Sequence, residues 1–379
     1  MNPGIGARRL GTGLGVGALA LLAVHPASAH TGTTHGGVPH VILLTMVLLG
    51  LVTVTGARVA FSRDVLQTRS AILVVLAGGV LFGIGAIGLV EIQVVASTGP
   101  ALDHLYPVTS PLAGSAVMVG SVLLTRVYWP DRPRYVVLGS ILGAWILYPV
   151  TMPSDGVTHP LGYVLVLGLP VAIGYVLWRD AREVIAAAAQ RPLPRRVGLV
   201  TGTLTTVIVA FSAGTLTVNP DEGINQPTSA YLQVFPVSDP LVTWPALEFY
   251  APSVPFAGMI SVGTVILFGI LGGLVGLNAA IVTERWQAGA DLTLRGTLVG
   301  ALSTTGATAC CCCAPAAYGV LSAILGTAAS PVYWAFMDTS SPLSTLFLTA
   351  SVLALTASAV YTERGPTWRA EDVPTSVSV

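Results

Sequence analysis

The stretch VILFGILGGLVGL at residues 265–277 contains only aliphatic residues, glycine and one phenylalanine. It belongs to an uncharged run over residues 256–283 that is long enough to cross about 30 Å of hydrocarbon as a helix. Similar runs recur along the 379 residues, of which 53% are hydrophobic and 9% charged, against about 25% charged in soluble domains. With a mean hydropathy of +0.78, this composition excludes a soluble enzyme, a disordered protein and a nucleic-acid binder.

We therefore predict an all-α fold, a polytopic transmembrane helix bundle of about nine spans over residues 40–361. Two pairs of glycines four residues apart, Gly79 with Gly83 and Gly272 with Gly276, are expected to let neighbouring helices approach closely. The predicted spans are 40–61, 71–95, 108–128, 135–151, 160–178, 197–217, 256–283, 296–326 and 342–361.

The amino end has the pattern of a secretory signal peptide over residues 1–29. Arg8 and Arg9 precede an apolar run at 10–24, and the small residues 27–29 form a cleavage motif. Cleavage would make His30 the first residue of an external arm, residues 30–39. The alternative is an uncleaved signal anchor, in which the terminal amine belongs to Met1.

The arginines predict the orientation of the bundle. All basic residues are Arg, and with an external amino end every Arg after the signal falls in a cytoplasmic segment: 57–70, 126–135, 179–196, 284–295 or the tail 362–379. This sorting is what the positive-inside rule requires of a multi-pass protein of the cytoplasmic membrane. The external loop 218–255 is rich in Pro and aromatic residues, which predicts a cap over the bundle or an interfacial segment.

The four cysteines are consecutive, Cys310, Cys311, Cys312 and Cys313, near the centre of the predicted eighth span. Pro315 removes a helical hydrogen bond and biases the preceding residue away from the helical region, so we expect this span to be broken at 310–315. In an intact helix only Cys310 and Cys313 would share a face, whereas unwound backbone would present more thiols.

Soft thiols without hard ligands favour a soft ion such as Cu(I). Two alternatives stay open: a thiol–disulfide pair that carries electrons, and inert buried cysteines. The stretch Cys312-Cys313-Ala314-Pro315 resembles the Cys-Cys-x-Pro or Cys-Pro stretches of mercuric-ion transport membrane proteins and of thiol-transporting membrane proteins of the cytochrome-maturation type. The resemblance covers these few residues, the rest of the chain follows neither pattern, and no family is claimed.

Potential metal ligands also gather on the predicted outer side. An amino-terminal His30 would offer an imidazole and an amine to one ion, and such termini resemble those of copper proteins with a histidine brace. Imidazole suits copper, zinc and nickel, and an acidic face raises the local concentration of cations. The outer candidates are His30, His35, His40, His104, His159, Glu91 and Asp103. For each single histidine, a place in a polar loop is the simpler interpretation.

These patterns predict a membrane protein that handles a soft metal ion, copper before others, by transport or delivery. No nucleotide or nucleic-acid partner is expected, because no phosphate-binding loop or polybasic patch is present in the sequence. Whether the protein is an enzyme is left open, with a non-enzymatic role favoured. The expected partners are the lipid bilayer and the metal ion, with a membrane or external redox partner under the alternative functions. Those alternatives are a thiol or electron relay, and a non-catalytic subunit or assembly factor of a membrane oxidoreductase.

Overall fold

The computed structural model describes residues 34–35, 38–63, 65–93, 103–152, 159–218, 229–253, 256–287, 335 and 341–364. Several predicted features lie outside these residues: the signal peptide, His30, the four cysteines, Pro315 with the predicted eighth span, and the tail from residue 365 onward.

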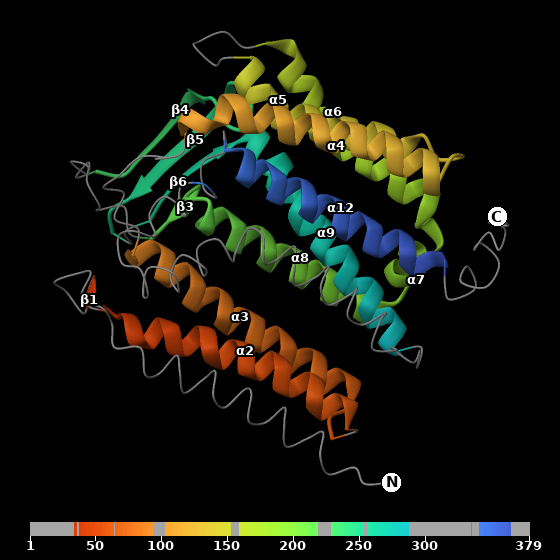
Figure 1. The fold of residues 1–379 in the computed structure, drawn as a ribbon. Coiled ribbons are helices and arrows are strands. Elements are labelled where there is room, and N and C mark those ends of the chain that lie inside the picture. The colour runs from red at the N-terminus through yellow and green to blue at the C-terminus, as the bar shows by residue number, and fades with distance from the viewer. Residues whose placement is uncertain are drawn as a thin grey trace, which may run out of the picture.

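Long apolar helices run side by side through the described structure (Figure 1). They are α2 (His40–Ser62), α3 (Thr68–Gln93), α4 (Tyr106–Tyr128), α5 (Arg134–Thr151), α6 (Pro160–Asp180), α8 (Pro192–Ser212), α9 (Val262–Gln287) and α12 (Pro342–Arg364), with the short helices η1 (Asp103–Leu105) and α7 (Arg182–Gln190). Apart from α8, each of these long helices is long and apolar enough to cross a membrane, which makes 7 candidate spans in the described residues. The predicted polytopic helix bundle is confirmed.

Helix α8 differs from the predicted span at 197–217 in where it starts and ends. It begins at Pro192, so Arg195 and Arg196 fall in its first turns and lower its apolar character. Its first residues still suit a helix start, because proline at the first helical position has no N–H to leave unpaired. The number of spans in the whole chain stays a prediction.

A four-stranded antiparallel sheet stands at one end of the bundle, where the sequence predicted a loop. Its strands are β3 (Leu216–Thr217), β4 (Tyr231–Val237), β5 (Trp244–Ala251) and β6 (Phe256–Ser261), in the order β3-β6-β5-β4. The predicted span 256–283 is therefore wrong at its start, because α9 begins only at Val262. The prolines obscured the strands, but Pro236 pairs with Pro245, so their missing N–H groups fall on one rung of the ladder. A two-stranded hairpin, β1 (Thr34–His35) with β2 (Val38–Pro39), precedes α2.

Glycine contacts bring α8 and α9 together. A Cβ on Gly276 would lie 2.5 Å from the carbonyl oxygen of Gly198, and one on Gly272 would lie 2.8 Å from that of Gly202. The predicted pair at 272 and 276 is thus at a close helix crossing, as small residues permit in membranes. The pair at 79 and 83 is only half right: Gly83 contacts Ile208 of α8, whereas Gly79 faces open space.

Helices α9 and α12 are parallel to each other. The buried side chain of Asn278 donates to the carbonyl of Leu355 at 3.1 Å, and Arg285 donates to the carbonyl of Thr362. Both bonds join residues 77 apart in sequence, so the two helices run in the same direction. The end of α9 at Gln287 and the start of α12 at Pro342 therefore lie at opposite ends of the bundle (Figure 1).

The glycine crossing predicts a position-specific effect of overpacking. Gly276→Val should lower the free energy of unfolding by about 1–3 kcal/mol, because the added carbons meet the backbone of α8. Gly273→Val is the matched control: it lies on the same helix, with nothing within 4 Å of its Cβ position, and pays the same helix propensity. The measurement is unfolding in detergent by titration with dodecyl sulfate. Equal losses for the two variants would contradict the close crossing.

Candidate functional site

The two ends of the bundle differ in charge. One end, called here the arginine end, is formed by the α2–α3 and α4–α5 connections, by α7, and by the last turns of α9 and α12, opposite the sheet (Figure 1). Each described arginine lies there: Arg58, Arg63, Arg69, Arg126, Arg132, Arg134, Arg179, Arg182, Arg191, Arg195, Arg196, Arg285 and Arg364. The segregation that the sequence predicted along the chain is thus also a segregation in space.

Ion pairs join helix ends within the arginine end. The Asp180 side chain is only 4% exposed and accepts from Arg134 at 2.6 Å and 2.5 Å and from Arg132 at 3.2 Å. The pairing of Arg134 is bidentate, the strongest geometry for a guanidinium and a carboxylate. A second pair joins Arg191, between α7 and α8, to Glu284 of α9 at 3.0 Å. These ion pairs hold neighbouring helix ends in position, which gives the paired groups a structural role.

The described ligand candidates occupy the opposite end, called here the sheet end. They lie where helices begin or end: His35 pairs with Val38 in the β1–β2 hairpin, His40 starts α2, Glu91 is in the last turn of α3, Asp103 and His104 form η1, and His159 precedes α6. Among the residues that the structure describes, no three His, Cys, Asp or Glu side chains come close enough to hold a metal ion. The described candidates therefore share one end of the bundle, but within the described part of the chain they do not form one metal centre.

Two of these residues have a structural role. The Nδ1 atom of His159 accepts a hydrogen bond from the backbone N–H of Leu161 at 3.2 Å and so caps the start of α6. An imidazole bound in this way has only Nε2 free for a ligand. The carboxylate of Asp103 accepts from the backbone N–H of His104 at 2.7 Å, which satisfies a donor at the start of η1.

The turn between β4 and β5, residues 238–243, packs into the sheet end of the bundle. Tyr163 of α6 donates to the carbonyl of Thr243 at 2.6 Å, and its ring makes an edge contact with Trp244 at 4.9 Å. Glycines provide the space: a Cβ on Gly162 would clash with Val242, and one on Gly263 would lie 2.5 Å from Pro240. Because Val242 and Trp244 belong to the buried core with α6 and α9, the turn closes the space between these two helices.

The sequence analysis did not identify this turn or Asp180. For the turn, the available signal would have been an aromatic residue four positions after the proline of an Asp-Pro pair, since Trp244 follows Pro240 by four residues and bonds to its carbonyl. For Asp180 no local pattern exists, because its partners lie 46 and 48 residues away.

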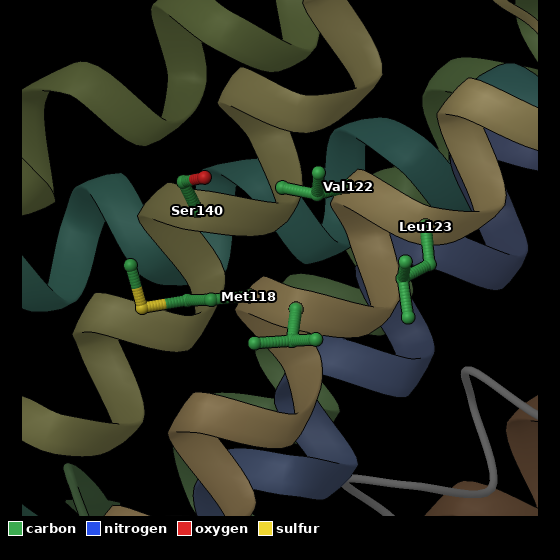
Figure 2. A pocket seen from close by; sticks show the side chains of 5 residues that line it. Met118, Val122, Leu123 and Ser140 are labelled. Carbon is green, nitrogen blue, oxygen red and sulfur yellow. The ribbon is translucent and has the colours of Figure 1, made fainter.

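Figure 2 shows a hollow between α4 and α5, with Met118, Val122 and Leu123 on one helix and Ser140 on the other. Its volume is about 230 Å³, and Val119 completes the lining. No titratable side chain lines it, so it suits an apolar chain and offers an ion only the weak donors of a thioether and a hydroxyl.

The cap at His159 can be separated from a ligand role by two substitutions. His159→Ala should lower the free energy of unfolding by about 1 kcal/mol, because the N–H of Leu161 loses its acceptor. His159→Asn should keep the stability, since an asparagine oxygen caps equally well. Unfolding in detergent measures both variants. Equal destabilisation by the two would contradict the capping role.

Comparison with known proteins leaves the function to be argued from this chain alone. No protein-family model, no curated protein and no solved structure matches it.

Proposed function

We propose that this protein handles a soft transition-metal ion, copper, by transporting or delivering it across the membrane through the cysteine run. The observation that carries the proposal is the parallel arrangement of α9 and α12. It requires the chain between Gln287 and Pro342 to return from the arginine end to the sheet end. A helix of 23 residues such as α12 is about 34 Å long, so Gln287 and Pro342 are about one membrane thickness apart.

The cysteines occupy the middle of this return in sequence. Cys310 follows Gln287 by 23 residues (310 − 287), and Cys313 precedes Pro342 by 29 (342 − 313). This spacing supports a position near the membrane midplane, which is where transporters with interrupted helices bind their ions. Pro315 lies beside the run and would supply the interruption.

Cysteine chemistry selects the ion. A thiol in apolar surroundings stays protonated and unreactive unless a cation compensates its negative charge. Cu(I) binds two thiolates with low coordination number, and soft sulfur prefers it to Mg²⁺ or Ca²⁺. Metal binding would therefore release protons from the thiols, and uptake should weaken as the pH falls.

The charge of the sheet end supports entry from that side. Among the described residues it carries Glu91, Asp103, Asp239 and Glu248 with no arginine, so cations are attracted to it. His40, His104 and His159 supply imidazole at the same end. Under the positive-inside rule this end is external, which places the mature amino terminus outside the cell and the carboxyl terminus in the cytoplasm.

The orientation can be tested with single reporter cysteines in the cell. Both Gln67, before α3 at the arginine end, and Ser229, before β4 at the sheet end, are exposed. In intact cells Ser229→Cys should react with a membrane-impermeant maleimide, and Gln67→Cys should react only after permeabilisation. The wild-type chain gives the background from its own cysteines. The reverse pattern would place the histidines inside and contradict the proposal.

The metal site can be tested by titrating the anaerobically purified protein with Cu(I) against a chromogenic chelator. Wild type should compete for the ion, and the variant with Cys310→Ser, Cys311→Ser, Cys312→Ser and Cys313→Ser should not. Met118→Leu is the control, because it removes a soft sulfur from the α4–α5 hollow and should leave binding intact.

Three outcomes decide the copper proposal. Loss of Cu(I) binding in the four-serine variant alone supports it. Equal binding by wild type and that variant shows that the cysteines are not ligands. Metal-independent protection from alkylation after oxidant treatment, without Cu(I) binding, identifies the cysteines as a redox pair and overturns the copper proposal.

A further inference from the structure

The four-stranded sheet has two chemically different faces. On one face Tyr231 and Gln233 of β4 donate to the two carboxylate oxygens of Glu248 in β5, at 3.0 Å and 2.6 Å. Desolvation and the hydrogen bond to Glu248 raise the pKa of the Tyr231 phenol, so it remains a neutral donor. Nearer the bundle, the same face contributes the buried residues Trp244 and Ala246 to the core. The polar groups named on this face are hydrogen-bonded to one another, and its apolar groups Trp244 and Ala246 are buried against the bundle.

The opposite face, called here the apolar face, is exposed and uncharged. The ladder register places Val234, Leu247 and Ile260 in one row across three strands, 69%, 41% and 37% exposed. Leu232 lies two residues from Val234 on the same strand and is 68% exposed. Since side chains alternate along a strand, every residue of β4, β5 and β6 on this face is Leu, Val, Ile, Phe, Ala, Pro or Gly.

The apolar face continues the lateral surface of the helices. Phe249 and Phe256 on this face are in contact at 5.4 Å between ring centroids, and Phe256 contacts Phe211 in the last turn of α8 at 6.4 Å. At the other junction, Val262 follows Ile260 by two residues and is the first residue of the candidate span α9. The Val262 side chain is itself half exposed. The apolar surface thus passes from helix to sheet without a polar break on the residues described.

The depth of the row follows from the start of α9. Ile260 precedes Val262 by two residues, or about 7 Å of extended chain, and the headgroup layer on each side of the hydrocarbon is about 5–8 Å thick. Figure 1 shows the strands crossing the end of the bundle that lies opposite the arginine end. On this spacing Ile260, a residue of the row, lies within a headgroup-layer thickness of the start of α9.

From this continuity and depth we propose that the apolar face of the sheet lies against the bilayer surface and contacts phospholipid in the headgroup layer. An exposed apolar surface of this extent is unfavourable in water, whereas the interfacial layer accepts apolar side chains. The same layer contains enough water to satisfy the free backbone groups of β4, an edge strand, which the hydrocarbon core would leave unpaired. The sheet would then act as an anchor that fixes the height of the sheet end on the membrane.

The test uses a photoreactive residue, p-benzoyl-phenylalanine, placed in the full-length protein in nanodiscs of phosphatidylcholine and phosphatidylglycerol. It replaces Val234 or Leu232 on the apolar face, and Gln233 on the opposite face of the same strand serves as the matched control. All three side chains are exposed, so the substitutions should not disturb folding. After irradiation, intact mass spectrometry measures the fraction of protein that carries one phospholipid.

Positions 232 and 234 should give several-fold more phospholipid adduct than position 233. Equal, low yields at all three positions would overturn the proposal. Adducts to a second copy of the chain, or an internal crosslink to another segment of it, at 232 or 234 would show that protein covers the apolar face and would also overturn it. The result is independent of Cu(I) binding, so the copper proposal and this one can fail separately.

Discussion

The structure depends on one constraint: in hydrocarbon, every backbone N–H and C=O must find its partner within the protein. Helices meet this constraint within each segment, and the bundle then needs only side chains that let the helices pack. Glycines at the α8–α9 crossing allow close backbone contact. The buried amide of Asn278 donates a hydrogen bond to a carbonyl of α12, because a buried polar group needs a partner within the protein. The strands lie outside the candidate span α9, which begins at Val262. At that end of the bundle the free backbone groups of an edge strand can bind water.

The helices were predictable because a span is a local property of the sequence. An uncharged run of sufficient length fixes a helix to within a few residues, as it does for α5, and the arginines mark which ends lie together. The sheet was missed because its evidence was weak and mixed: strands of six to eight residues around Pro236 and Pro245 have the composition of a loop. Only the register, which sets the two prolines opposite each other, makes the strands compatible with them.

Individual contacts between helices could not be predicted from the sequence, for a different reason. Asp180 resembles any acid near a run of arginines, and its burial between Arg132 and Arg134 follows only from the way α5 meets α6. The same holds for the candidate site. The histidines that the structure describes lie at one end of the bundle, but the sequence could not show that His159 uses Nδ1 to cap a helix. The residue type of His159 suggested a metal ligand, whereas the structure shows that its Nδ1 accepts a hydrogen bond from the backbone of Leu161.

The first two long helices have a consequence for how the protein is made. Helices α2 and α3 interlock through Gly50, Gly78 and Gly85, so a short hairpin completes its own packing. The contact of Gly83 with Ile208 and the stacking of Phe61 on Trp286, at 5.2 Å, join this hairpin to segments made much later. During synthesis the hairpin is complete long before its partners emerge, whereas α9 waits for residues 77 further on to satisfy Asn278. The sequence separation of the contacts thus suggests the order of assembly: the α2–α3 hairpin packs early, and α9 packs against α12 late.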